Sequence, residues 1–344
     1  MRKILPFVKP SARAYQFFAF PLAIMETEPR TQDWVLSNFI QLEYDKYGQD
    51  PVPFCFYLYD HAANPWLEVI RTTREWSRIN GADAVELARN AVAANFYAHV
   101  VVDEFYIPRR LAYGRTHLPH DLLIHGVDDG AGLLHILGFD EQMEFGTSTV
   151  TIEEFRQAYG AFDIFCLDYG SGASGALHLT PASVFFYRLC PTGRYALNLS
   201  LIERTLREYL GSVNSSQHFE MLEEPWDRAY GVACYDHLAE YLNEYLAGAR
   251  PYDIRHLHLL FEHKRLMTRR VGRLMEFLGR DLTGLVDAAA RVEAAARGLR
   301  NGMIMHGLRG GSSNFSRTGA AALVRLRDEE VELLEGVLAA LGAG

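Results

Sequence analysis

His120 and Asp140 are the two residues whose types and spacing best suit proton-transfer chemistry. His120 heads the run Asp121–Ile124, and Asp140 directly follows the apolar run Leu133–Phe139. Their separation of 20 positions suits two strands joined by turn chemistry at 128–130, and an antiparallel pair would set the two side chains next to each other. A carboxylate there accepts the imidazole N–H and raises the basicity of the opposite ring nitrogen. We therefore predict that this pair is catalytic.

The elements that must hold the pair are strands and helices in the N-terminal half. The run Tyr97–Val102 predicts a buried strand, and Ala84–Ala94 predicts an alanine-rich helix that Asp83 could cap. Thr151 and Glu154 have the spacing of a capping box, which indicates that a helix begins there.

Strand and helix signals continue along the rest of the chain. Phe162–Leu167 and Val184–Leu189 predict two further strands, and from residue 230 onward apolar residues recur at helical spacing, most clearly in Ile254–Leu278. The predicted fold class is α+β in three parts: an α/β domain with an antiparallel sheet over 1–160, a sheet-rich connector that completes its core over 161–200, and a helical domain over 201–344.

Composition excludes several classes of function. The net charge of -9 disfavours binding to nucleic acid or to an anionic membrane. The four cysteines lack C-x-x-C spacing, which is typical of reduced thiols in a cytosolic protein. The chain has no apolar run long enough for a transmembrane helix, and its first residues lack the apolar core of a signal peptide. We therefore expect a cytoplasmic protein.

An acidic protein partner, such as a carrier protein, would need a local basic patch on this acidic chain. The candidates are Arg109 with Arg110, and Arg265 with Arg269 and Arg270. A solvated charged face is the favoured interpretation of each.

Two further patterns suggest ligands, and we reject both. The stretch 170–175 reads G-x-G-x-x-G, but Pro181 interrupts the helix that a dinucleotide site requires. His256, His258 and His263 invite a metal site, but His256 and His263 are one heptad apart, whereas a helical metal pair is four apart. We expect no metal ion and no cofactor.

Three segments around His120 resemble one known family. Val102–Pro108 reads as a strand ending in Asp103 followed by Tyr-x-Pro, His120–Asp128 reads as a strand led by histidine with a Gly-x-Asp turn, and Phe139 with Asp140 closes the unit. This layout is similar to the N-terminal domain of the butirosin-biosynthesis H-type acyltransferases over roughly residues 10–160. The resemblance implies a papain-like fold.

The resemblance also implies a nucleophile that this chain lacks. In that family a cysteine at the start of a buried helix takes an acyl group from a carrier protein and passes it to an amine. The corresponding stretch, 11–24, holds no cysteine, and Ser11 is its one side chain with ordinary nucleophile chemistry. Tyr15 lies in an aromatic cluster that predicts a core helix or a groove for an acyl chain. Asp103 and Tyr106 are expected to be further substrate contacts.

Three functions stay open. The leading hypothesis is an acyl- or aminoacyl-transferase of natural-product biosynthesis, of nonribosomal-peptide or aminoglycoside type. It would move an acyl group from a carrier-protein thioester or a small-molecule thioester to an amine acceptor, with His120 as the base and Asp140 as its orienting partner. The alternatives are a thioesterase- or peptidase-like hydrolase and a non-catalytic pseudoenzyme that binds a carrier protein. A homodimer also stays open.

Overall fold

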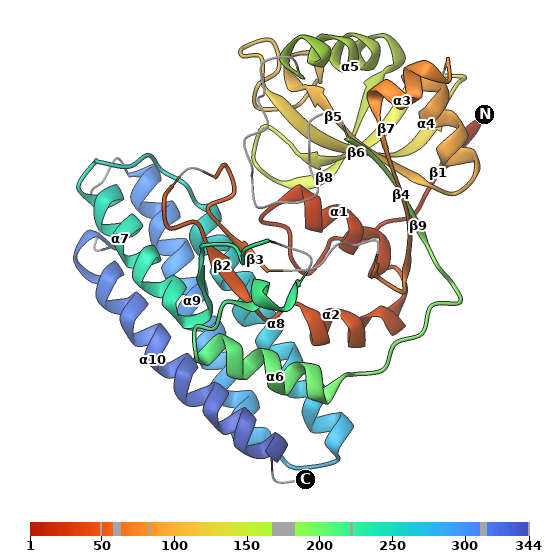
Figure 1. Ribbon diagram of the computed structural model, residues 1–344. Coiled ribbons are helices and arrows are strands. Elements are labelled where there is room, and N and C mark those ends of the chain that lie inside the picture. Colours follow the sequence, from red (N-terminus) through yellow and green to blue (C-terminus); the bar gives the residue numbers. More distant parts are fainter. Residues whose placement is uncertain are drawn as a thin grey trace. The chain divides into compact units, whose positions relative to one another are not determined.

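The chain folds into two compact units with antiparallel sheets and a helical C-terminal region (Figure 1). The computed structural model describes residues 1–48, 50–57, 63–81, 83–166, 183–220, 223–309 and 315–342. Unit 1 comprises Met1–Thr31 and Tyr59–Tyr195, and unit 2 comprises Gln32–Leu58 and Ala196–Gly344. The predicted α+β class is confirmed at this level. The units differ from the predicted division because the stretch 32–58 joins the C-terminal half.

Unit 1 is built on an antiparallel sheet in the order β4-β9-β5-β6-β7-β8, with β1 pairing to β6. Its helices α4 and α5 contact β5, and α1 contacts β6 and β9. Because β5 is covered from both sides, its residues are buried on both faces of the sheet (Figure 1). The strands are β1 (Arg2–Ile4), β4 (Leu67–Thr73), β5 (Tyr97–Asp103), β6 (Pro119–Asp128), β7 (Leu133–Phe139), β8 (Phe145–Thr151) and β9 (Ser183–Leu189). The helices are α1 (Gln16–Met25), α3 (Arg74–Ile79), α4 (Ala84–Ala93) and α5 (Ile152–Cys166).

Local signals placed most of these elements correctly. The predicted hairpin is present as β6 and β7, and the capping box opens α5, since Thr151 Oγ1 donates to Glu154 (2.7 Å) and accepts the Glu154 N–H (3.1 Å). The strand predicted at Phe162–Leu167 is wrong, because α5 continues to Cys166. The G-x-G-x-x-G stretch at 170–175 lies outside the described residues.

Helix α1 is buried almost all round, which explains its uniformly apolar sequence. Nine of its ten residues are buried, and Gln16, the first of them, is the only polar one. The interpretation of this aromatic stretch as a core helix is confirmed.

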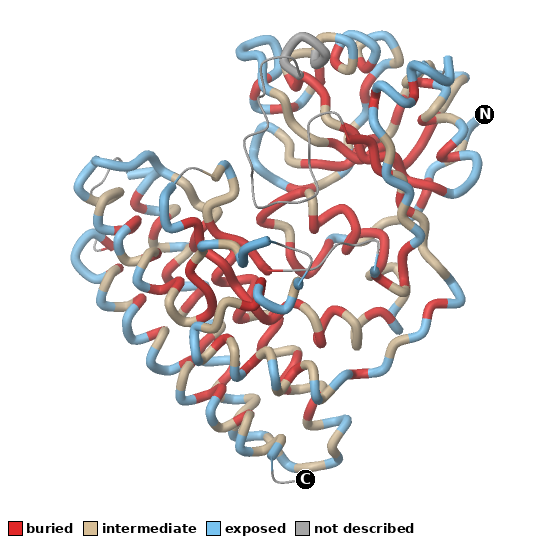
Figure 2. Tube along the Cα trace, in the orientation of Figure 1, coloured by how far each residue is buried: buried red, intermediate tan, exposed pale blue. Residues whose placement is uncertain are grey.

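Unit 2 joins a three-stranded sheet, in the order β10-β2-β3, to a set of packed helices. Helix α8 packs on α9, and α9 packs on α10. Buried and exposed positions alternate along these helices (Figure 2), as amphipathic packing requires. The strands are β2 (Leu42–Tyr44), β3 (Phe54–Phe56) and β10 (Ala229–Tyr230), and the helices are α2 (Gln32–Asn38), α6 (Leu199–Leu210), α7 (Cys234–Leu246), α8 (Arg255–Leu278), α9 (Thr283–Leu308) and α10 (Phe315–Gly342).

Two arginines of the predicted basic patches are structural. Arg270 is fully buried, and its guanidinium donates to the carbonyl oxygens of Leu36 (2.6 Å) and Phe39 (2.7 Å) at the C-terminal end of α2. Carbonyl groups at the C-terminal end of a helix have no hydrogen-bond partner within it. The buried guanidinium supplies hydrogen bonds to them, and its positive charge interacts favourably with the negative end of the helix dipole. Arg110 is also buried. Neither arginine is available to a partner protein.

Candidate active site

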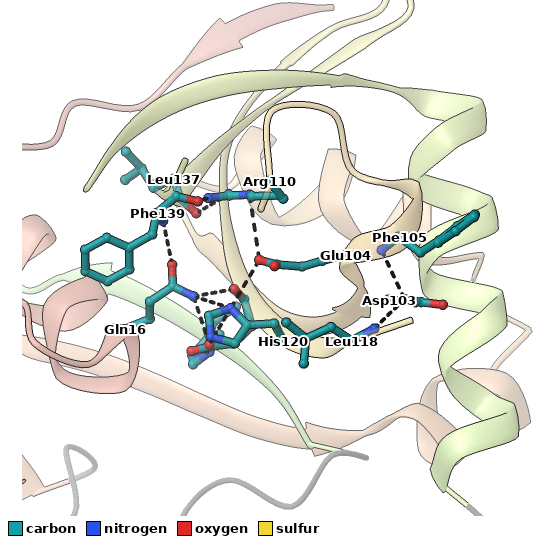
Figure 3. A network of polar contacts seen from close by, with 11 residues as sticks. Gln16, Asp103, Glu104, Phe105, Arg110, Leu118, His120, Leu137 and Phe139 are labelled. Atoms are coloured by element: carbon teal, nitrogen blue, oxygen red, sulfur yellow. Dashed lines mark hydrogen bonds and ion pairs between the residues drawn. The ribbon is translucent and has the colours of Figure 1, made fainter. Parts of the chain in front are cut away.

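His120 lies at the start of β6 and is surrounded by polar side chains from two other elements (Figure 3). Its Nδ1 atom is 3.2 Å from Glu104 Oε1, 3.0 Å from Gln16 Nε2 and 3.7 Å from Asp121 Oδ1. The imidazole is 41% exposed, whereas the Glu104 side chain is 10% exposed. A buried carboxylate therefore meets a histidine that still faces solvent.

The register of the sheet brings Glu104 to His120. Val102 of β5 is paired with His120, and Asp103 is paired with Pro119. Glu104 follows directly in a short 3-10 turn, Glu104–Tyr106, which directs it toward the head of β6. Glu104 was part of the motif that carried the family resemblance, but the sequence assigned it no role. Its place one residue beyond a strand that pairs with the His120 strand is the signal that could have identified it.

Gln16 stands at the first position of α1, and its side-chain amide bridges two strands. Oε1 accepts the Phe139 N–H (3.1 Å), and Nε2 donates to Asp121 O (2.6 Å) and Asp121 Oδ1 (2.9 Å). Since Asp121 engages both Nε2 protons, we assign the His120 Nδ1 proton to Glu104. In the neutral imidazole, His120 Nε2 then carries the lone pair. In the sequence, Gln16 could have been identified as the one polar residue of an otherwise apolar helix.

The position of Asp140 corrects the predicted dyad. The pairing of Leu123 with Leu137 would set residue 120 opposite residue 140 if it continued, but it ends there. The Gln16 amide occupies the place where Asp121 and Phe139 would otherwise pair. Asp140 Oδ1 instead accepts the N–H groups of Gln142 and Glu144, at 2.9 Å each. Within the described residues, the Asp140 carboxylate makes no ion pair with His120.

Close packing around Gln16 requires a glycine on β7. A Cβ atom at Gly138 would lie 2.5 Å from Gln16 Oε1 and 2.6 Å from Arg110 Nη1. Arg110 donates to the carbonyl oxygens of Phe139 and, at 3.3 Å, Leu137, and its Nε lies 3.9 Å from Glu104. The guanidinium thus holds the end of β7 beside Glu104 (Figure 3).

The charges around His120 favour its protonated form. Desolvation lowers the pKa of His120, but the hydrogen bond to Glu104 and the charges of Asp121 and Glu104 outweigh it, so the pKa is raised above the ordinary value of 6.5. Burial opposes ionisation of Asp121, yet the hydrogen bond from His99 and the charge of His120 hold its pKa at about 2. Asp121 therefore stays ionised.

A second histidine supports Asp121 from inside the sheet. His99 of β5 is buried, with Nε2 3.1 Å from Asp121 Oδ2 and Nδ1 3.2 Å from the Tyr187 hydroxyl of β9. This contact fixes the Asp121 carboxylate, which the Gln16 amide also binds. The sequence assigned no role to either residue: Asp121 was part of the His120–Asp128 segment that carried the family resemblance, and His99 lay outside the segments that did.

Asp103 and Tyr106, the two further predicted substrate contacts, differ in their exposure to solvent. The Asp103 side chain is fully buried and accepts from His117 Nδ1 (2.6 Å) and the N–H groups of Phe105 (3.1 Å) and Leu118 (3.0 Å). It therefore closes the loop 105–118, which corrects its predicted role. Tyr106 is half-buried, with its ring 5.0 Å from that of Phe105, and its role stays a prediction.

Ser11 and Tyr15 also serve the structure around α1. The Ser11 hydroxyl bonds to Glu26, the C-cap of α1, and the Ser11 N–H donates to the same carboxylate (2.8 Å). A ten-residue helix is about 15 Å long, which separates Ser11 from Gln16 at the other end. Ser11 is therefore not the nucleophile beside His120. Tyr15 is buried, and its ring lies 5.5 Å from Phe17 and 5.8 Å from Phe18, so it packs in the core.

The histidines of α8 take separate roles in unit 2. His263 is fully buried and its Nε2 lies 2.8 Å from the Ile40 carbonyl oxygen, whereas His256 stacks on Tyr241 at 3.9 Å. In the part of the chain that is described, no group of three or more His, Cys, Asp or Glu side chains could hold a metal ion.

Two comparisons with known proteins, by family model and by curated sequence, bear on this site. No protein-family model matches this chain, and no curated protein matches it either. Among the described residues, none of the helices has the length and apolar character needed to cross a bilayer.

Proposed function

We propose that unit 1 transfers an acyl group from a thioester to an amine without forming a covalent acyl-enzyme. The observation that carries this proposal is the pairing of the His120 imidazole with the Glu104 carboxylate at 3.2 Å, opposite the Gln16 amide at the start of α1. The acyltransferase family that the sequence resembles has a thiol at the start of its helix. We also propose that α1 and the sheet are arranged as in papain-like enzymes, with Gln16 at the helix start and His120 on the facing strand.

The proposed mechanism is direct attack assisted by a general base. His120 Nε2 takes a proton from the amine acceptor as its nitrogen attacks the thioester carbonyl carbon. The C–N bond forms, the C–S bond breaks, and the proton passes to the departing thiolate sulfur. Glu104 keeps the Nδ1 proton in place and stabilises the imidazolium that forms. A carrier protein or a small thioester is the proposed donor.

Turnover of acyl-loaded carrier protein with an amine acceptor, followed by mass spectrometry, tests this proposal. His120→Ala is expected to lower the rate by about 10²–10⁴, since it removes the general base. Glu104→Gln is expected to lower the rate by a substantial part of the same factor, since it removes the carboxylate that holds the Nδ1 proton. The matched control is His135→Ala, a histidine on the neighbouring strand β7. Equal turnover by wild type and His120→Ala would remove His120 from the mechanism.

A non-catalytic binding protein is the second candidate, and Gln16 is the observation that favours it. The amide at the head of α1 has its oxygen and both protons engaged, so it supplies no nucleophile. Tight carrier binding with no product from any acceptor would support this candidate. Product formed with water in place of the amine would instead identify a hydrolase.

A further inference from the structure

Unit 2 contains a cavity that has no part in the chemistry proposed for unit 1. Its volume is about 230 Å³, and it is enclosed by the segment after β2, by α7 and by the turn before α8. Cavities for drug-sized ligands measure roughly 300–1,000 Å³, so this one suits a smaller molecule. Its lining combines aromatic rings with charged side chains of both signs.

Arg250 presents hydrogen-bond donors to this cavity. Its Nε donates to Glu244 Oε2 at 2.8 Å, which fixes the guanidinium plane. A Cβ at Gly48 would lie 3.2 Å from Nη1, so the head group lies against the glycine backbone. Within the described residues, neither Nη1 nor Nη2 has a hydrogen-bond partner. A guanidinium with two such donors is suited to bind a carboxylate.

Glu240 supplies a carboxylate on the same wall. It precedes Glu244 by four residues on α7, so the two side chains are neighbours on one face of the helix. Within the described residues its ion-pair contact is with His237, whose Nδ1 lies 3.7 Å from Glu240 Oε2, and 68% of the Glu240 side chain is exposed. The Arg250 guanidinium is thus held by Glu244, which is one helical turn along α7 from Glu240.

The other cations of the cavity are already neutralised. Lys46 pairs with Asp227, and Arg255 donates to both carboxylate oxygens of Asp253. Arg250 also pairs with Glu244, but its Nη1 and Nη2 donors have no partner in the described part of the chain, so we take Arg250 and Glu240 as the charged groups that a ligand could contact.

The floor of the cavity is aromatic and uncharged. The Tyr44 hydroxyl lies 3.3 Å from His256 Nε2, and His256 stacks on Tyr241. Desolvation lowers the pKa of His256 to about 4, so the imidazole is neutral at pH 7. Burial raises the pKa of Tyr44, the charge of Arg250 lowers it and the charge of Glu240 raises it. The floor therefore adds apolar contact without competing for a charged ligand.

We propose that this cavity binds a free α-amino acid, with its carboxylate on Arg250 Nη1 and Nη2 and its ammonium group on Glu240. The two charges of an α-amino acid are fixed in a short molecule, and a guanidinium and a carboxylate on the same cavity wall match them in sign. The side chain of the amino acid then contacts Tyr44 and Tyr241.

Calorimetric titration of the full-length protein with the twenty L-amino acids tests the proposal. We expect at least one to bind, and its decarboxylated amine and its deaminated acid to bind at least about tenfold more weakly, since each loses one charged contact. Arg250→Met and Glu240→Gln should each weaken binding to the same extent. The matched control, Arg207→Met, removes an exposed arginine paired with Glu203 on α6 and should leave binding unchanged.

The absence of binding by any amino acid at up to about 10 mM, well above a millimolar Kd, would overturn the proposal. It would also be overturned if the decarboxylated amine bound as tightly as the amino acid. Binding that is unchanged in both Arg250→Met and Glu240→Gln would overturn it too. Saturation-transfer NMR on the same ligands gives an independent reading. All of these results are separate from the acyl-transfer assay, because Arg250 and Glu240 belong to unit 2.

Discussion

Replacing Glu330 with alanine is expected to lower the stability of unit 2 by about 3–5 kcal/mol, because it leaves a buried ammonium group without its counter-charge. Glu330 of α10 and Lys264 of α8 are both fully buried, with Lys264 Nζ 2.5 Å from Glu330 Oε1. A loss of this size is a large fraction of the roughly 5–15 kcal/mol that stabilises a typical domain. Urea unfolding followed by circular dichroism measures it.

The effect is large because Glu330 is the acceptor for three helices. Its Oε2 accepts the hydroxyl protons of Tyr209 of α6 (2.9 Å) and Tyr235 of α7 (2.8 Å). Lys264 Nζ also lies 2.9 Å from His263 Nδ1. Desolvation lowers the pKa of Lys264, and the charge of Glu330 opposes this effect. Without Glu330, α10 loses the buried polar contacts that this carboxylate makes with α6, α7 and α8.

Two variants separate this cause from a general effect of mutating α10. Glu329→Ala changes the exposed neighbouring residue and is expected to alter stability by no more than about 0.5 kcal/mol. Lys264→Met added to Glu330→Ala should recover part of the loss, because it removes the uncompensated charge. Equal stability of the Glu329 and Glu330 variants would contradict the account of this network.

Replacing Gln16 with cysteine is expected to create a reactive thiol. The side chain at this position is at the N-terminus of α1 and faces His120, and a helix N-terminus and an imidazolium both stabilise a thiolate. We expect its pKa to fall below the usual value of about 8.5, so that alkylation at pH 6 is roughly tenfold to hundredfold faster than for an ordinary thiol. Iodoacetamide kinetics as a function of pH measure this, with wild-type reactivity subtracted.

The neighbouring position supplies the control for this experiment. Phe17→Cys places a thiol one residue further along α1, on a different side of the helix. It should titrate closer to the ordinary value, and adding His120→Ala to Gln16→Cys should slow alkylation. A Gln16→Cys thiol no more reactive than Phe17→Cys would show that the head of α1 does not face His120 in solution.

Much of unit 1 could be predicted because its signals are local. The β6–β7 hairpin follows from two apolar runs and an Asp-Asp-Gly turn, and α5 begins where Thr151 and Glu154 form a capping box. The end of α5 could not be predicted, because a short apolar run such as 162–167 fits a strand or a helix equally well. The placement of 32–58 in unit 2 depends on the pairing of β2 with β10, which are far apart in the sequence.

The partner of His120 could not be predicted for a similar reason. The register that would set Asp140 opposite His120 is present for two pairs, Ile124 with Ile136 and Leu123 with Leu137, after a shift of one residue between Gly126 and Ile124. It ends there because a side chain 104 residues away in the sequence, Gln16, inserts its amide between the strands. A contact between residues so far apart along the chain leaves no recognisable pattern in a single sequence. The mechanism therefore depends on Glu104, which contacts His120 from the turn that directly follows the adjacent strand, β5.

The most direct test of this site is an NMR titration of His120 in wild type, Glu104→Gln and Asp140→Asn. We predict a wild-type pKa above 6.5 that falls in Glu104→Gln and changes little in Asp140→Asn. Since the pKa is raised by folding, the pair stabilises unit 1 fully below about pH 6.5, and this stability is lost as pH rises through the folded pKa. A pKa that falls in Asp140→Asn and stays unchanged in Glu104→Gln would contradict the account.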